Sequence, residues 1–465
     1  MKRPLILLLL AFFVISASAQ EKQDKEKDNT KGKDKEQKVK TGWNFGGLPV
    51  VSYDTDMGFE YGALMELYQY GKGDLFPDYY HKFYFEVSRF TKGSAIYRFN
   101  YESPHLIPGV RLSTDLAYLP DAASDFYGFN GYDAVFNSSW ADKKQDGGAD
   151  YLTRMYYRQK RNLFRFKNDF VGKLAGEHFY WNAGFAIQKF NVDTVDVVRF
   201  NKGKNLADQL PWNINNGNTL SLYQLYQDWG IIPNSDSRGG LINTIKLGLS
   251  YDSRDNRPNP MKGIWTEAGI EVSPKFIGSD ASFGRFYLTH RQYFTLVPNK
   301  LSFVYRLGYQ QTIFGTVPFY YQSQVIVSVL RGAYSEGLGG SKTLRGILRN
   351  RIIGDGFFYG NAEFRWKAVR FTFLKQNWYL GLNAFSDFGM VTKKISFSTP
   401  TQAEMPAGYT VNQFFKTDAE KLHVSAGAGV RFVMNQNFVI AIDFGKAFND
   451  QDGNKGIYIG LNYLF

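Results

Sequence analysis

Apolar and polar side chains alternate in segments of about ten residues that recur along much of this chain. From Ile245 to Asp252 the odd positions carry Ile, Leu, Leu and Tyr, and the even positions carry Lys, Gly, Ser and Asp. Successive side chains of a β-strand point to opposite faces, so each such strand has one apolar and one polar face. A closed sheet of such strands, apolar outside and polar inside, can cross a membrane. The alternation therefore predicts an all-β transmembrane barrel.

The N-terminus indicates export. Residues 1–19 combine Lys2 and Arg3, an apolar run from Leu5 to Ile15, and the small-residue site Ala17-Ser18-Ala19. The apolar run is short for a bilayer, which favours a secretory signal peptide over a membrane anchor. Residues 20–41 are rich in Lys, Asp and Glu and hold few apolar side chains, so we predict a disordered periplasmic tail. Residues 42–465 then form the barrel.

The composition agrees with an outer-membrane barrel. Aromatic residues make up 17% of the chain, there are 46 glycines and no cysteine, and mean hydropathy is −0.34. A secreted β-sandwich is the alternative, but it rarely needs so many strands or aromatic residues. The net charge is +12, but the positive residues form no compact basic patch with base-stacking aromatics. This argues against a nucleic-acid-binding protein. Positively charged loops are expected to face anionic lipid headgroups, so we expect outer-membrane lipids as a partner.

Counting alternating segments predicts sixteen antiparallel strands. They lie near residues 44–54, 57–70, 82–91, 94–102, 110–119, 151–170, 178–192, 241–252, 262–273, 283–296, 300–314, 357–368, 377–388, 422–434, 437–446 and 456–465. Short links at Thr295–Lys300, Leu374–Gln376 and Asn435-Gln436 are predicted periplasmic turns. Long links at 120–150, 193–240, 315–356 and 389–421 are predicted extracellular loops.

The end of the chain has the pattern of a closing barrel strand. In Gly456–Phe465 a single face carries Ile457, Ile459, Leu461, Tyr463 and Phe465. This resembles the C-terminal recognition signal of outer-membrane barrels, and it predicts that all five side chains share one face of the last strand.

Four sequence motifs indicate which family of barrels this chain is similar to. They are Phe126-Tyr127-Gly128-Phe129-Asn130-Gly131, Tyr251-Asp252-Ser253-Arg254-Asp255-Asn256, Leu344-Arg345-Gly346 and Phe385-Ser386-Asp387-Phe388-Gly389. In these residues, their order and their spacing, the chain resembles the barrel of the bacterial surface antigen family, the BamA/TamA type of outer-membrane assembly and translocation proteins. The second motif, with Asp252, Arg254 and Asp255, alternates in charge around a turn, so we expect it to stabilise that turn.

The third motif predicts a contact inside the barrel, which we call the lumen latch: Arg345 and Gly346 with Glu363 and Asp387. A guanidinium in a loop folded into the lumen loses hydration and needs carboxylates. Strand parity places Glu363 and Asp387 on the inner wall. The resemblance implies the same partners. A solvated surface loop with Arg345 in water is the alternative, and a phosphate-binding loop is not favoured because no strand-to-helix context follows.

A lateral seam is predicted where the first strand meets the last. Gly46, Gly47 and Pro49 lie in the first strand, and Gly460 and Phe465 in the last. Proline cannot donate to the ladder, so this junction should be weak. The resemblance implies a seam that opens laterally, whereas a merely strained strand start explains the same residues.

The functional expectation follows from the resemblance: insertion or translocation of outer-membrane proteins, or envelope biogenesis, with nascent outer-membrane proteins or other envelope assembly subunits as partners. Family members normally carry periplasmic client-binding modules before the barrel, and here only the tail 20–41 precedes it. A passive or plugged pore for small solutes and a structural accessory subunit are the alternatives. We expect no enzyme, cofactor or metal site, because the five histidines are scattered and no nucleophile motif occurs.

Overall fold

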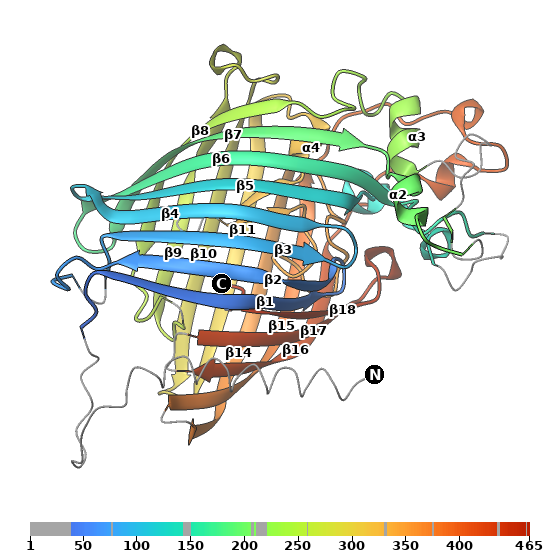
Figure 1. Ribbon diagram of the computed structural model, residues 1–465. Coiled ribbons are helices and arrows are strands. Elements are labelled where there is room, and N and C mark those ends of the chain that lie inside the picture. Colours follow the sequence, from blue (N-terminus) through green and yellow to red (C-terminus); the bar gives the residue numbers. More distant parts are fainter. Residues whose placement is uncertain are drawn as a thin grey trace.

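The computed structural model describes residues 39–75, 78–142, 150–205, 209–210, 221–257, 259–329, 333–373, 376–434, 438–461 and 463–465. Sixteen strands in these ranges close into one antiparallel barrel, which confirms the predicted number and fold class (Figure 1). The predicted signal peptide and most of the predicted tail lie outside the described residues.

The first eight barrel strands are β1 (Trp43–Asp54), β2 (Gly58–Gln69), β3 (His81–Phe90), β4 (Ala95–Ile107), β5 (Val110–Asp125), β6 (Arg158–Ala175), β7 (Phe179–Asp193) and β8 (Leu241–Asp252). The other eight are β9 (Gly263–Ser273), β10 (Phe283–Val297), β11 (Leu301–Gly315), β14 (Gly356–Phe373), β15 (Gln376–Lys393), β16 (His423–Met434), β17 (Phe438–Ala447) and β18 (Lys455–Leu461). Each pairs with its neighbours in sequence order, except that β11 pairs with β14 and β1 with β18.

The two ends of the barrel differ in their links. One end, the turn end, carries the short links between β4 and β5, β6 and β7, and β10 and β11. The opposite end, the loop end, carries the long links 126–157, 194–240, 316–355 and 394–422. The predicted turns at 374–376 and 435–436 fall largely outside the described residues.

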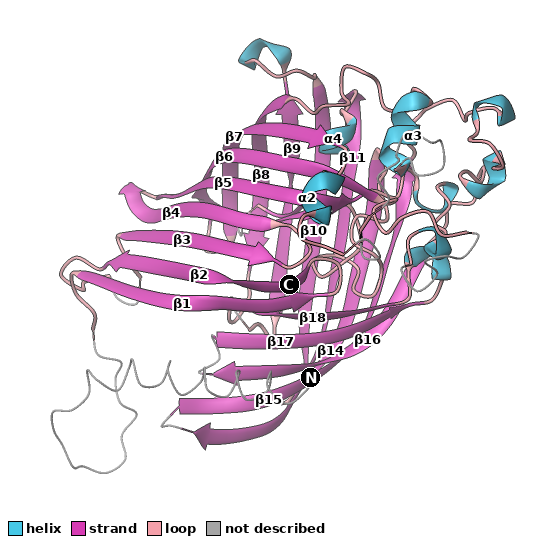
Figure 2. Ribbon diagram, turned by 45° about the vertical axis from the view of Figure 1, so that its right-hand side comes forward, coloured by secondary structure: helices cyan, strands magenta, loops and turns pink. Residues whose placement is uncertain are grey.

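Short helices occur in the links. The helices α2 (Val197–Asn201), α3 (Leu222–Asp228) and α4 (Phe319–Gln322) lie at the loop end (Figure 2). Single-turn 3-10 helices cover Gly131–Asp133, Ser138–Trp140, Lys275–Ile277, Gln402–Glu404, Val411–Gln413 and Asp450–Asp452. Among the described residues, no helix has both the length and the apolar character needed to cross a membrane.

The wall has the predicted two faces. In β8, Leu247 and Leu249 are exposed on the outside, whereas Lys246 and Ser250 are buried inside. The outer apolar side chains are those that a lipid environment would cover, and the inner polar side chains form ion pairs, such as Lys246 with Asp169 at 2.7 Å.

Several strand boundaries differ from the prediction. Strand β6 begins at Arg158, so the predicted start at 151 is wrong. The two residues just before it, Tyr156 and Tyr157, are buried with Phe126, Phe129 and other aromatic residues from four links. This aromatic cluster fills the loop end. It explains the wrong start of β6, because aromatic residues that pack in a loop produce the same alternating pattern in the sequence as aromatic residues that face lipid.

The link 316–355, which we call the lumen loop, lies inside the barrel. It contains a two-stranded sheet of β12 (Gln324–Ser328) and β13 (Ala333–Glu336). Wall residues hold its backbone: Arg285 Nη1 and Gln310 Nε2 donate hydrogen bonds to the Gln324 carbonyl at 3.0 and 2.9 Å. The loop is therefore part of the barrel interior.

The barrel closes unevenly. Strand β1 pairs with β2 along its whole length, but with β18 only at Tyr53 opposite Ile459 and at Asp54 opposite Tyr458. The Thr55 amide continues this contact by donating to the Ile457 carbonyl at 3.1 Å. All of these contacts lie at the loop end, so the half of β1 nearest the turn end has no partner strand on this side among the described residues.

The end of the chain corrects the prediction that five residues share one face of the last strand. Ile457 and Leu461 are exposed on the outside, but Tyr463 and Phe465 are buried within the barrel. Strand β18 ends at Leu461, and Phe465 packs against Tyr293 of β10 and Val304 of β11. Phe465 therefore does not belong to the strand pairing of the seam.

This uneven closure predicts position-dependent disulfide formation in a chain that has no cysteine of its own. The pair Tyr53→Cys/Ile459→Cys should oxidise readily because these residues face each other. The pair Val51→Cys/Leu461→Cys, which would be opposite if the same register continued, should oxidise far more slowly. Gel mobility after mild oxidation measures both, and equal rates would contradict the described seam.

Candidate functional site

The lumen loop meets the wall at Arg345 and Gly346, where glycines permit a very close approach. Gly346 has φ 92°. A Cβ atom there would lie 2.6 Å from the Gly445 carbonyl carbon, and a Cβ at Gly445 would lie 2.7 Å from that of Arg345. Only glycine at both positions leaves room for this backbone contact. The loop therefore lies directly on β17.

This contact puts the Arg345 guanidinium among three carboxylates. Its Nε and Nη2 donate to the two oxygens of Asp387, each at 2.9 Å, in a bidentate pair. Nη2 also lies 2.7 Å from Glu363 Oε1, and Nη1 lies 3.4 Å from Asp443 Oδ2. The guanidinium carbon lies 3.5 Å from the centroid of the Phe385 ring. The structure thus brings together the four residues of the predicted lumen latch and adds Asp443 and Phe385.

The same carboxylates serve two further arginines. Arg365 Nε lies 2.8 Å from Glu363 Oε2, and Arg431 Nη2 lies 2.8 Å from Asp443 Oδ2. Three guanidiniums and three carboxylates from β14, β15, β16, β17 and the lumen loop therefore form one buried network. In such a network the loss of one charge leaves its partners unpaired, which costs about 3–5 kcal/mol.

Other arginines hold the lumen loop at points that the sequence did not indicate. Arg306 Nη2 donates to the Lys342 carbonyl at 3.1 Å, and Asn361 Nδ2 donates to the Thr343 carbonyl at 2.7 Å. Arg349 pairs with Asp121 and Asp125 of β5 at 3.0 and 2.7 Å. The loop is thus tied to opposite walls of the barrel.

The turn motif is a compact hydrogen-bonded unit. Arg254 makes a bidentate pair with Asp252, with both distances 2.8 Å, and lies 3.8 Å from the centroid of the Trp265 ring. Asp255 Oδ1 accepts from the Met261 and Lys262 amides. All three predicted charges thus make hydrogen bonds in or beside the link from β8 to β9.

The predicted seam glycines lie in an uncrowded part of the wall. Gly46, Gly47 and Pro49 are opposite Glu66, Met65 and Ala63 of β2. Gly460 is opposite Ala441 of β17. A Cβ at Gly46 or Gly460 would meet nothing within 4 Å. Close packing therefore does not require glycine at these two positions.

A buried carboxyl lies at the closed end of the seam. Asp56, in the link from β1 to β2, is 6% exposed, and its amide donates to Asp54 Oδ1 at 2.8 Å. Burial, and next the Asp54 carboxylate, raise the pKa of Asp56 to about 7. This group therefore titrates near neutral pH beside the two residue pairs that close the seam among the described residues.

A second polar cluster joins the links at the loop end. His423 is fully buried, with Nδ1 2.5 Å from Asp452 Oδ1 and Nε2 3.2 Å from Glu420 Oε2. Tyr132 stacks on the imidazole at 3.8 Å between centroids, and its hydroxyl donates to Asp452. Both ring nitrogens face carboxylates, so neither is left to act as a base. Within the described ranges, no group of three or more His, Cys, Asp or Glu could hold a metal ion.

The first motif, Phe126–Gly131, connects links at this end. Asn130 adopts φ 64°, its amide donates to the Ile353 carbonyl at 2.7 Å, and its side chain exchanges hydrogen bonds with the backbone of Ile395. The motif therefore joins the link 126–157 to the lumen loop and to the link 394–422.

Together these features define a transmembrane antiparallel β-barrel with a loop pinned inside it and an incompletely paired seam. Residues 81–465 match the Omp85 superfamily domain, so the chain belongs to the Omp85 superfamily, which confirms the family resemblance seen in the motifs. It is an outer-membrane barrel of that superfamily.

Two solved structures show the same fold. BamA from Haemophilus ducreyi lacking POTRA domains 1–3 is 14% identical, with 91% of this chain and 71% of that chain covered and a TM-score of 0.52. CdiB from Escherichia coli is 8% identical, with 90% of this chain and 62% of that chain covered and a TM-score of 0.53. This chain therefore spans less than two thirds of that CdiB. No curated protein matches the sequence.

Removing the central guanidinium should destabilise the barrel. Arg345→Ala leaves Glu363, Asp387 and Asp443 with less positive charge, so we expect the free energy of unfolding in detergent to fall by about 3–5 kcal/mol. Arg111→Ala, which removes a more exposed ion pair with Glu102, is the control and should cost less than about 1 kcal/mol. Equal effects of the two substitutions would show that the network is not structural.

The Asp56 carboxyl should make stability depend on pH. Its pKa is raised in the folded state, so the folded chain binds the extra proton between about pH 4 and 7, and its contribution to the free energy of unfolding falls as pH rises through that window. Asp56→Asn should therefore be more stable relative to wild type at pH 8 than at pH 5. Thermal unfolding measures this, with the exposed Asp78→Asn as the control, and a difference independent of pH would contradict it.

Proposed function

We propose that this Omp85 barrel inserts or translocates polypeptides at the outer membrane, and that the seam between β1 and β18 is where it does so. The observation that carries the proposal is the short pairing of the seam, limited to Tyr53 with Ile459 and Asp54 with Tyr458. An exposed strand edge offers unpaired N–H and C=O groups to another strand. The turn-end half of β1 presents such an edge.

The side chains along this edge support the proposal. Trp43 and Phe45 are 62% and 82% exposed, and Val51 is also exposed on the same face of the strand. A polypeptide with alternating apolar residues could add its strand here and continue the apolar outer face of the barrel. In the proposed topology the turn end faces the periplasm, together with the tail of residues 20–41, and the loop end faces the outside. Nascent outer-membrane proteins or other envelope assembly subunits are the proposed partners.

The lumen latch has a supporting role in this proposal. The Gly346 amide donates to the Tyr458 hydroxyl at 3.1 Å, and Tyr458 is one of the two β18 residues that pair with β1. The position of the lumen loop is thereby connected to the closed end of the seam. We propose a non-catalytic role for the chain, in line with the full engagement of the His423 ring by carboxylates.

Locking the seam tests this function. Oxidised Tyr53→Cys/Ile459→Cys joins the two strands, so we expect it to lower the outer-membrane content of other barrel proteins or of secreted polypeptides in cells that depend on this chain. A reductant should restore both. The matched control is Val87→Cys/Tyr97→Cys, which joins β3 to β4 at opposed residues away from the seam. Unchanged envelope proteins under a complete seam lock would contradict the proposal.

A pore for small solutes is the second candidate, since a barrel of sixteen strands can enclose an aqueous channel. The buried lumen loop and the aromatic cluster at the loop end oppose it. Large, steady single-channel currents from the wild-type chain that Arg345→Ala leaves unchanged would favour the pore.

A further inference from the structure

Two lysines face each other on the outer surface of the barrel at the loop end. Lys446 of β17 and Lys455 of β18 are directly opposite in the antiparallel register. Both side chains are exposed, and strand parity turns them outward, because the neighbouring positions Gly445 and Gly456 are buried on the lumen side. Opposite residues of antiparallel strands have Cβ atoms about 4.5–5.5 Å apart, so the two ammonium groups can reach one shared ligand.

No acidic side chain compensates this lysine pair within the described ranges. Neither lysine forms an ion pair there with a carboxylate, Asp450 in the link between the two strands included. Asp452 of the same link is buried and engaged by His423. Like charges directly opposite each other destabilise a sheet. The lysine pair therefore favours an anion that lies between the two side chains.

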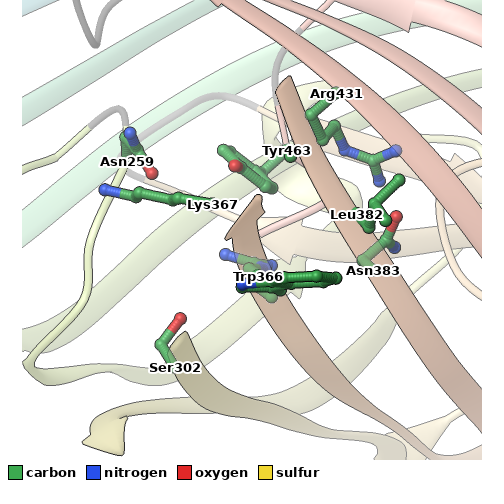
Figure 3. Close-up of a pocket in the computed structure, with 10 residues that line it drawn as sticks. Asn259, Ser302, Trp366, Lys367, Leu382, Asn383, Arg431 and Tyr463 are labelled. Atoms are coloured by element: carbon green, nitrogen blue, oxygen red, sulfur yellow. The ribbon is translucent and has the colours of Figure 1, made fainter. Parts of the chain in front are cut away.

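Other lysines of the wall have neighbours that offset their charge. On the outer face at the same end of the barrel, Lys160 of β6 is opposite Asp193 of β7. Near the turn end, Lys367 borders a hollow of the inner wall that has room for about one water molecule (Figure 3). Its Nζ lies 5.2 Å from the centroid of the Tyr379 ring. The lysine pair on β17 and β18 has neither an opposed carboxylate nor such a ring contact in the described part of the chain.

The lysine pair lies within an apolar part of the outer surface. Along the chain Lys446 lies between Phe444 and Phe448, which are 45% and 70% exposed, and Ile457, two residues after Lys455, is 43% exposed. A free inorganic ion would gain nothing from these side chains. The acyl chains of a lipid would cover them while its headgroup meets the lysines. The surroundings therefore favour a lipid over a free anion.

We propose that Lys446 and Lys455 bind the phosphate of an anionic membrane lipid whose acyl chains lie along Phe444 and Ile457. The two ammonium groups would donate to phosphate oxygens, and the phosphate would offset the repulsion between them. The site lies beside the closed end of the seam, where the Ile457 carbonyl accepts from the Thr55 amide. In the proposed topology the lipid belongs to the outer leaflet. Binding at this site does not depend on the function proposed for the seam.

Native mass spectrometry of the purified full chain in a neutral detergent tests the site. Anionic phosphatidylglycerol should bind more tightly than zwitterionic phosphatidylcholine. Lys446→Gln/Lys455→Gln should weaken phosphatidylglycerol binding about thirtyfold, because two lysines no longer meet the anionic headgroup. The matched control Lys202→Gln/Lys416→Gln removes two exposed lysines from separate links at the same end of the barrel, with the same change in net charge, and should bind like wild type.

Thermal unfolding gives a second readout, because the substitutions remove a repulsion as well as a site. Phosphatidylglycerol should raise the Tm of wild type and leave that of Lys446→Gln/Lys455→Gln unchanged. Without lipid, this variant should unfold at no lower temperature than wild type. If it does not fold, Lys455→Gln alone keeps the test decisive, with about fivefold weaker binding expected.

Two results would overturn the proposal. The first is equal phosphatidylglycerol binding by wild type and Lys446→Gln/Lys455→Gln, or an equal loss in the two double variants, which would show only a general effect of net charge. The second is displacement of the lipid by sodium phosphate at equal concentration, which would identify a site for free phosphate.

Discussion

The interior of this barrel depends on the burial of one guanidinium, that of Arg345. A charge removed from water is tolerable only with partners, and Arg345 finds them on three different strands: Glu363 on β14, Asp387 on β15 and Asp443 on β17. Since Glu363 and Asp443 also balance Arg365 and Arg431, wall and loop neutralise each other. The lumen loop is therefore part of the core, because the charged inner wall depends on it for charge balance.

As a result, some parts of the barrel are held by more contacts than others. A sixteen-stranded barrel is too wide for wall side chains alone to fill, and here the lumen loop and the aromatic cluster occupy the interior and the loop end. The seam has no such support near the turn end, where β1 and β18 are not paired among the described residues. Segments with few backbone hydrogen bonds open at low free-energy cost. The proposed role of the seam draws on this contrast between a rigid interior and one weak junction.

Much of this arrangement could be predicted from the sequence, because period-two alternation and strand parity are local properties. They predicted the sixteen strands and placed Glu363 and Asp387 on the inner wall, opposite a loop arginine. They could not reveal where a ladder ends: Tyr463 and Phe465 continue the apolar pattern of β18 yet turn inward, and Tyr156 alternates like a strand residue but packs in a loop. The backbone contact of Gly346 with Gly445 depends on a tertiary approach between residues far apart in sequence, for which one sequence carries no signal.

The inward turn of the chain after β18 competes with closure of the seam. If the register of Tyr53 with Ile459 continued, Pro49 would face Tyr463, and proline offers no N–H to that ladder. Closure would thus gain a few hydrogen bonds of about 1 kcal/mol each. The inward turn places Tyr463 and Phe465 with their ring centroids 4.4 and 4.8 Å from the Arg365 guanidinium, contacts worth up to about 2 kcal/mol each when desolvated, and buries both rings. Pairing of β1 with β18 beyond Leu461 would therefore require Tyr463 and Phe465 to give up these contacts and their burial.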